Sequence, residues 1–282
     1  MLPALVTPFD EEGEFDERAH RTNLSTLAGR GVSGFVLAGS TGEGPYLEPG
    51  ERVRLVSTTR DELGSAVPVL CGIAGESTRI ALSQIEEAAT GGADAALVMT
   101  PTTLARGRSS VVERHFSSVA DRSPIPILLY SVPPVTGYEL PIEAIFATAA
   151  HPNVMGMKDS GGDATRVDEL VTLIGPEFVF YAGASRAVSA SVTRGATGAI
   201  TASANYAPGL VAAAASGNEE AQATLISLTK VIEAEGLPGT KMAAELTGLH
   251  PGPPRRPLAP VSSAARNRIA AALESAGLRV PT

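Results

Sequence analysis

The chain has 282 residues and an apolar fraction of 44%, enough to bury a sizeable core in one barrel-sized domain or two smaller domains. Its net charge is −8 and its basic residues are scattered, so nucleic acids and anionic membranes are poor partners. No apolar stretch is long enough to span a membrane, and the amino terminus lacks the pattern of a signal peptide. The single cysteine, Cys71, excludes an internal disulfide framework and is expected to be a buried core residue. We therefore expect a cytoplasmic protein.

Short apolar runs alternate with helical patterns along most of the chain. Eight such runs, bounded by Gly, Pro, Ser or Thr, indicate buried strands at residues 2–6, 35–38, 67–71, 95–99, 127–129, 154–157, 178–181 and 197–200. Helical patterns lie between them, at 16–30, from 49, 77–90, 109–121, from 141, 165–174 and 185–194. Asp16 and Ser77 are suited to cap the helices that follow them.

This alternation predicts a (β/α)8 TIM barrel with additional C-terminal helices. A doubly wound open sheet is the rival, but it has fewer strands and often a glycine-rich phosphate loop, and no such signature follows the first strand. We expect residues 1–206 to form the barrel. Residues 207–282 are expected to form a helical extension packed on it, interrupted by the Pro- and Gly-rich stretch 248–260.

Two reactive side chains end neighbouring predicted strands. Tyr130 follows the run 127–129, and Lys158 follows the run 154–157. Consecutive strands joined by a helix are parallel, so both side chains should emerge on the same rim of the barrel, where the active sites of such barrels lie. Taken alone, the lysine would be a solvated charge and the tyrosine a core residue. Together, a phenol and an amine on one rim indicate carbonyl chemistry.

The rest of the predicted rim is rich in hydroxyls and glycines. Side chains alternate along a strand, so Ser160 should share a face with Lys158 while Asp159 points the other way. The rim has no histidine, and the four histidines of the chain lack metal-ligand spacing, so we expect no metal site: His20, His115, His151 and His250.

A lone lysine among hydroxyls fits a Schiff-base mechanism that needs no cofactor. The pKa of a free lysine is near 10.4, too high for attack on a carbonyl at neutral pH. We expect enclosure by Val154, Met155 and Met157 to favour the neutral amine. Tyr130 could then move protons, and the backbone N–H groups and hydroxyls of Gly39-Ser40-Thr41-Gly42 could hold a substrate carboxylate. The alternative for that stretch is a tight turn that merely requires glycine.

Four segments carry a family resemblance. The sequences GSTGE (39–43), YSVPPVTG (130–137), GMKDSGGD (156–163) and GLPGTK (236–241) together resemble the dihydrodipicolinate synthase/N-acetylneuraminate lyase family. The resemblance covers essentially the whole chain. It implies a class I, pyruvate-handling aldolase on a (β/α)8 barrel, in most cases a homotetramer. It also implies a Schiff-base lysine, Lys158, and a proton-relay tyrosine, Tyr130. By the same resemblance, Ser40 and Thr41 would hold the pyruvate carboxylate, and Gly183 and Ile200 would line the pocket. Ser160, on the face of Lys158, is a further candidate for binding substrate.

Within the family, the segments 123–137, 151–166 and 252–258 are most similar to the 4-hydroxy-2-oxoglutarate aldolase branch, whose products are pyruvate and glyoxylate. The lysine-biosynthetic synthases carry an arginine where this chain has Val135. Most members also have paired tyrosines where this chain has Thr102 and Thr103, which leaves the usual proton relay in doubt. Arg106 and Arg108 on the same loop are candidates for binding a second carboxylate, with a surface role as the alternative.

We therefore expect a carbon–carbon lyase that acts on pyruvate and an aldehyde, as a homo-oligomer (tetramer or dimer). The alternatives are a dihydrodipicolinate synthase-like enzyme, a sugar-acid aldolase for 2-keto-3-deoxy acids or N-acetylneuraminate, and a dehydratase that uses the same imine. From another class, a non-catalytic family member that only binds oxo acids is also open.

Overall fold

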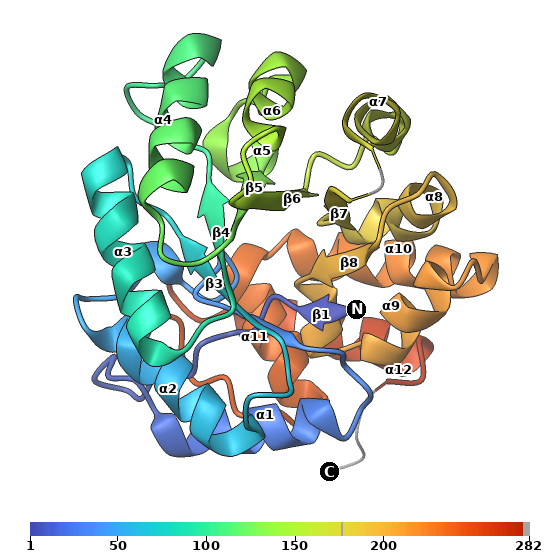
Figure 1. The fold of residues 1–282 in the computed structure, drawn as a ribbon. Helices are drawn as coiled ribbons and strands as arrows, with labels where there is room; N and C mark the ends of the chain where they lie inside the picture. The colour runs from blue at the N-terminus through green and yellow to red at the C-terminus, as the bar shows by residue number, and fades with distance from the viewer. Residues whose placement is uncertain (176, 279–282) are drawn as a thin grey trace.

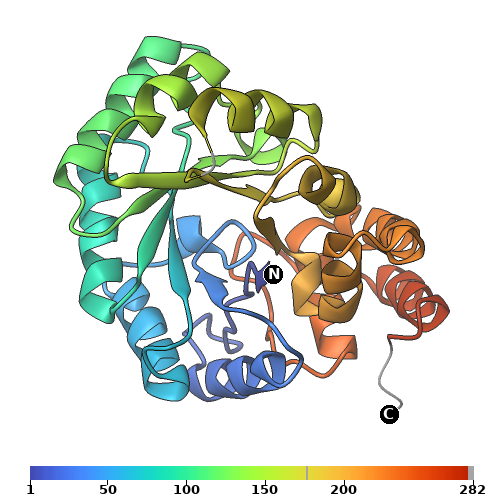
Figure 2. The ribbon, with the colours of Figure 1, turned by 45° about the vertical axis from the view of Figure 1, so that its right-hand side comes forward.

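The computed structural model describes residues 1–175 and 177–278. Eight parallel strands form one sheet in the order β1-β8-β7-β6-β5-β4-β3-β2, and an isolated bridge between Ala4 and Val36 brings β1 and β2 together. The sheet is thus a nearly closed barrel inside a ring of helices (Figures 1 and 2). The strands are β1 Leu2–Pro3, β2 Phe35–Leu37, β3 Val69–Ile73, β4 Ala95–Met99, β5 Ile127–Ser131, β6 Val154–Asp159, β7 Val179–Ala182 and β8 Gly198–Thr201. The predicted (β/α)8 barrel is confirmed.

Helices follow the strands in turn around the barrel. They are α1 Glu17–Ala28, α2 Glu51–Leu63, α3 Thr78–Gly91, α4 Ser109–Arg122, α5 Pro133–Thr136, α6 Ile142–Ala149, α7 Thr165–Ile174 and α8 Val188–Thr193. The two predicted caps are confirmed, because the Asp16 side chain accepts from the Ala19 N–H and the Ser77 side chain accepts from the Ile80 N–H.

Three predicted elements differ from the structure. The segment between β5 and β6 holds two helices rather than one, because Pro133 and Pro134 start a short helix that ends at Gly137, with φ of 73°. The helix predicted over 185–194 begins as a 3-10 turn and becomes α-helical at Val188. The first strand spans two residues instead of the five predicted.

The apolar side chains form two layers, one on each face of the barrel strands. On β5, Ile127 and Leu129 pack outward against the helices, while Leu128 and Tyr130 join a cluster inside the barrel. This alternation follows from the two-residue period of a strand. The alternation determines which residues of each apolar run point into the barrel and which point toward the helices.

Four further helices follow β8: α9 Pro208–Ala215, α10 Glu219–Glu233, α11 Gly236–Leu246 and α12 Ser263–Ser275. One apolar cluster joins α9 and α10 to β7 and β8 through Ala182, Ala199, Val211 and Leu225. A second cluster, which includes Ile232 and Ile269, joins α10, α11 and α12 to one another. Among residues 1–175 and 177–278, no helix is long and apolar enough to cross a membrane.

Candidate active site

Tyr130 and Lys158 lie side by side at the carboxyl ends of β5 and β6. The two residues are partners in the strand register, the Lys158 Nζ donates to the Tyr130 hydroxyl at 3.3 Å, and it lies 4.4 Å from the centre of the ring. Both side chains are buried, with 5% of Lys158 and 4% of Tyr130 exposed. The predicted pairing of phenol and amine on one rim is therefore observed.

The Lys158 side chain is enclosed, but the residues predicted to enclose it are wrong. Met155 is 41% exposed, and Val154 and Met157 belong to the outer apolar layer, against the helices. Met157 neighbours Lys158 along the strand, so its side chain leaves by the opposite face. The apolar surroundings of Lys158 come instead from the inner cluster that contains Tyr130.

The electrostatic environment favours proton release by Tyr130. Burial alone would raise the pKa of its phenol, but the Lys158 ammonium and the hydroxyls of Ser40 and Ser160 lower that pKa below its ordinary value. An easily released proton suits a group that must give and take a proton during carbonyl chemistry.

Gly183 lies directly against the lysine. A Cβ at this position would lie 2.2 Å from the Ser160 Oγ and 2.9 Å from the Lys158 Cε. Only a glycine leaves room for both side chains, so Lys158, Ser160 and Gly183 are brought together as predicted. Ile200 is fully buried in the inner cluster that contains Tyr130.

The loop 39–42 follows β2 on the same rim. Its turn is closed by hydrogen bonds from the backbone N–H groups of Gly42 and Gly44 to the Gly39 carbonyl. A small cavity borders Gly39, Ser40 and Tyr130. The Ser40 Oγ is buried and forms no hydrogen bond of ordinary geometry among the described residues, and Thr41 is half-buried beside it. The Ser40 hydroxyl therefore lies close enough to the phenol to lower its pKa, although the contact departs from ordinary hydrogen-bond geometry.

Other rim hydroxyls support the backbone instead. The Thr7 hydroxyl donates to the Gly42 carbonyl at 2.6 Å, and the Thr100 hydroxyl donates to the Tyr130 carbonyl at 2.8 Å. Both side chains are buried. They hold the loop and the strand that carry the candidate ligand-binding groups.

The loop after β4 is anchored by a carboxylate that sequence reasoning missed. Glu76 accepts hydrogen bonds from the backbone N–H groups of Thr102 and Thr103, and the Thr102 hydroxyl also donates to it. Farther along, the Arg106 guanidinium donates to the Thr136 carbonyl and packs against Gly137, although the residue is exposed. Arg106 thus lies beside the turn that contains Val135.

The residue after Lys158 on β6, Asp159, forms a buried ion pair. Asp159 points away from Ser160, as predicted, and accepts from the Arg166 guanidinium at 3.1 Å, which ties β6 to α7. Burial raises the pKa of this carboxyl above its ordinary value. The sequence showed a polar residue in the right place, but its partner is seven positions away on a helix and could not be identified from spacing.

Two of the four histidines and the cysteine lie in the core, whereas His250 is exposed and His151 is partly exposed beside Asp121. His20 and His115 are buried, and burial lowers their pKa values to about 3 and about 4. Burial raises the pKa of the Cys71 thiol to about 12, in agreement with a core role. In the described part of the chain, no three His, Cys, Asp or Glu residues lie close enough together to hold a metal ion.

A sequence profile of the dihydrodipicolinate synthetase family matches residues 1–276. The chain belongs to this family. Family members are lyases with a characteristic Schiff-base lysine, and the chain is accordingly a carbon–carbon lyase of the class I aldolase type. It is 33% identical to the 4-hydroxy-tetrahydrodipicolinate synthase of Acidiphilium cryptum over 286 residues, and 34% identical to that of Mesorhizobium japonicum over 288 residues, with 98% of each chain covered in both cases.

Solved structures of the family agree with the fold. The dihydrodipicolinate synthase of Acinetobacter baumannii, solved in complex with pyruvate, is similar to this chain with a TM-score of 0.92 at 27% identity, over 98% of both chains. Both comparisons leave open which aldehyde this family member uses.

Proposed function

We propose that the chain is a class I aldolase in which Lys158 forms a Schiff base with pyruvate, and that its partner aldehyde is glyoxylate, as in a 4-hydroxy-2-oxoglutarate aldolase. The observation that carries the first part is the buried contact between the Lys158 Nζ and the Tyr130 hydroxyl at 3.3 Å. The Acinetobacter relative, solved with pyruvate, supports pyruvate as the oxo acid.

In this mechanism the neutral Lys158 amine attacks the ketone carbon of the oxo acid. The oxygen takes up two protons, one from the amine nitrogen and one from the Tyr130 hydroxyl, and leaves as water, so that a protonated imine and a Tyr130 phenolate remain. When the aldol is cleaved, its hydroxyl gives its proton to the Tyr130 phenolate, the C–C bond breaks to release glyoxylate, and the electron pair of that bond moves toward the protonated imine nitrogen to give a neutral enamine. Protonation of that enamine and hydrolysis release pyruvate and free Lys158.

The carboxylate of the oxo acid is assigned to the loop 39–42. The hydroxyls of Ser40 and Thr41 and the backbone N–H groups of the loop provide hydrogen-bond donors without a cation. The buried Ser40 Oγ and the small cavity that Ser40 shares with Tyr130 support this assignment. Ser160, Gly183 and Ile200 are proposed to line the pocket next to Lys158.

We propose glyoxylate because of the residues at the position expected to bind the aldehyde substrate. Val135 cannot make the bidentate contact of an arginine with a carboxylate. We propose that Arg106, beside the same turn, supplies the second carboxylate contact. A dihydrodipicolinate synthase-like or sugar-acid specificity and a dehydratase are the alternatives within the mechanism, and a non-catalytic oxo-acid binder is the alternative outside it.

The decisive experiment is borohydride trapping with pyruvate, followed by intact mass and peptide mapping. The chain has three lysines, Lys158, Lys230 and Lys241, so the site of modification can be assigned without ambiguity. We expect one reduced pyruvate on Lys158, none in a Lys158→Ala variant, and full labelling in a Lys230→Arg control. A folded wild-type protein without an adduct would refute the imine with pyruvate.

The aldehyde is then tested by adding glyoxylate, aspartate semialdehyde or sugar aldehydes to the pyruvate-loaded enzyme. We expect turnover with glyoxylate to exceed turnover with the others. Faster turnover with aspartate semialdehyde would assign the chain to the synthases instead. Imine formation without turnover of any aldehyde would favour the oxo-acid binder.

We further propose that residues 1–206 form the barrel and that residues 207–282, of which 279–282 lie outside the described residues, belong to its packed extension. We also propose that the enzyme is a cytoplasmic homo-oligomer. Sedimentation of the purified protein and fractionation of the producing cells test the last two statements.

A further inference from the structure

The loop 39–42 is bracketed by two non-glycine residues in the left-handed region of backbone space. Ala38 has φ of 51° and Glu43 has φ of 56°. This conformation is uncommon for residues with a side chain, and it persists only where the surroundings hold it. The loop is also tightly packed, since a Cβ on Gly44 would lie 1.9 Å from the Ala38 carbonyl oxygen. Contacts from outside the loop must therefore maintain its shape.

The strongest of these contacts is a buried ion pair with the C-terminal helices. The Glu43 carboxylate lies 2.6 Å from the Lys241 Nζ, and it also accepts from the Arg255 backbone N–H at 2.7 Å. The side chains of Glu43 and Lys241 are 0% and 3% exposed. Lys241 also donates a hydrogen bond to the Pro253 carbonyl at 2.7 Å. The end of the loop is thereby fixed to α11 and to the segment after it.

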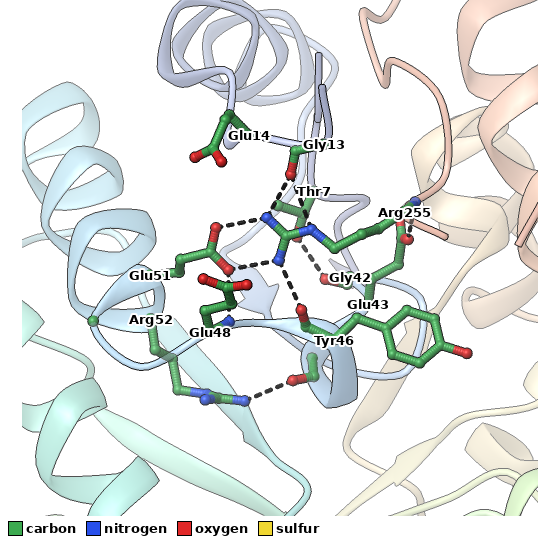
Figure 3. A network of polar contacts seen from close by, with 12 residues as sticks. Thr7, Gly13, Glu14, Gly42, Glu43, Tyr46, Glu48, Glu51, Arg52 and Arg255 are labelled. Carbon is green, nitrogen blue, oxygen red and sulfur yellow. Dashed lines mark hydrogen bonds and ion pairs between the residues drawn. The ribbon is translucent and has the colours of Figure 1, made fainter. Parts of the chain in front are cut away.

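Arg255 extends this attachment across the rim. Its guanidinium donates to both carboxylate oxygens of Glu51 and to the carbonyls of Gly13 and Tyr46 (Figure 3). Its Cζ lies 4.1 Å from the centre of the Phe9 ring, and the Lys241 Nζ lies 4.8 Å from it. The same arginine therefore connects the C-terminal segment to α2 and to the loop after β1.

Two further bonds hold the loop from the barrel side. The Arg52 guanidinium, 2% exposed, donates to the Gly44 carbonyl at 2.9 Å, and the Thr7 hydroxyl donates to the Gly42 carbonyl (Figure 3). These two contacts hold backbone carbonyls in and directly after the loop, whereas the Glu43 side chain holds the C-terminal end of the loop. Because the loop is held from both sides, its N–H groups and hydroxyls are fixed in a single conformation.

We propose that Glu43, Lys241 and Arg255 are positioning residues that hold the loop 39–42 in the shape that binds the carboxylate of the oxo acid. None of the three is assigned a contact with substrate, and each acts through the loop. This proposal rests on the proposed function of the loop. Its physical basis is that oriented donors bind a carboxylate well only when they are held in place before the ligand arrives.

The test compares Glu43→Gln, Lys241→Met and the double variant. Each single change leaves a buried charge without its partner, so it should lower both stability and pyruvate affinity. The double variant removes both charges, so its melting temperature should recover. If the pair positions the loop, the pyruvate concentration for half-maximal borohydride trapping should remain raised by about tenfold, equal to about 1.4 kcal/mol. Trapping at saturating pyruvate should stay close to that of the wild type.

The control is Arg60→Met, which breaks the ion pair between Arg60 and Asp94 near the amino-terminal ends of β3 and β4. This variant should melt earlier without a change in the pyruvate midpoint. If the Glu43/Lys241 double variant does not fold, Arg255→Lys takes its place. Lysine keeps the positive charge but not the several N–H donors of the guanidinium. This variant should therefore show a smaller rise in the pyruvate concentration for half-maximal trapping.

The outcomes separate the two proposals. A wild-type pyruvate midpoint in the double variant, or in Arg255→Lys if that is the variant used, would refute the positioning role while the imine with Lys158 stands. A wild-type protein that forms no pyruvate adduct would refute the proposed function, and the assignment of the loop would fall with it.

Discussion

The Lys158 Nζ lies 3.3 Å from the Tyr130 hydroxyl and 4.4 Å from the centre of the same ring. One tyrosine therefore contacts the amine both through its oxygen and through the face of its ring. The ring contributes packing and a cation–π contact, whereas the hydroxyl contributes hydrogen bonding and proton transfer. These two contributions can be separated by mutation.

Tyr130→Phe should keep the ring contact but remove the proton carrier. We expect imine formation with pyruvate to slow by about 10²- to 10⁴-fold, the usual contribution of general acid–base catalysis. Rapid-quench borohydride trapping measures this rate. Tyr206→Phe, which changes a buried tyrosine that precedes α9 and packs against the C-terminal helices, is the control and should leave the rate unchanged. An unaltered rate in Tyr130→Phe would exclude the proton-relay role.

Gly183→Ala should abolish imine formation, because the new Cβ would meet the Ser160 Oγ at 2.2 Å and the Lys158 Cε at 2.9 Å. The lysine or Ser160 must move to make room. Gly209→Ala is a matched control, since its Cβ would meet nothing within 4 Å and the residue lies in α9. We expect the control to keep full trapping and to gain about 0.5–1 kcal/mol of stability from the better helix former. Normal trapping in Gly183→Ala would disprove the close packing at this site.

Arg106→Met should weaken use of the aldehyde without affecting the imine. A charge-assisted hydrogen bond contributes about 1.5–3 kcal/mol, so kcat/KM for glyoxylate should fall by roughly 10- to 100-fold. Pyruvate trapping should be unchanged. Arg108→Met on the same loop is the control, and we expect wild-type kinetics from it. Equal losses in both variants would indicate a general effect of loop charge rather than a specific contact.

The buried histidines should make the protein sensitive to acid. His20 packs against Phe15 and hydrogen-bonds Thr59, with Arg21 nearby, and its pKa is lowered to about 3. An unfolded histidine binds its proton near pH 6.5, so the unfolded state takes up more protons than the folded state below that pH. Stability then falls as the pH falls, by up to about 1.4 kcal/mol per pH unit for each such histidine.

This slope should appear between about pH 6.5 and the folded-state pKa values, about 3 for His20 and about 4 for His115. Urea unfolding at several pH values measures it. A His20→Leu variant should have a shallower slope than the wild type, because one proton uptake is removed. An identical slope in that variant would show that His20 does not titrate on unfolding.

The alternation of apolar runs and helical patterns was sufficient to predict the barrel, because each run is local and its ends are marked by Gly, Pro or capping residues. The rim positions of Tyr130 and Lys158 could be predicted for the same reason, since parallel strands end at one rim. The lysine's surroundings could not. Met155 and Met157 lie within three residues of Lys158 in sequence, but Met155 is exposed and Met157 faces the helices.

The sequence by itself determined the fold class and the reactive pair on the rim, both of which depend on residues close together in the chain. Only the tertiary structure decided which side chains surround and support that pair. Glu43 and Lys241 are 198 positions apart, and Arg255 reaches Glu51 and Gly13 from the C-terminal segment. Such contacts depend on where distant segments meet after the barrel closes, and no local pattern encodes that meeting.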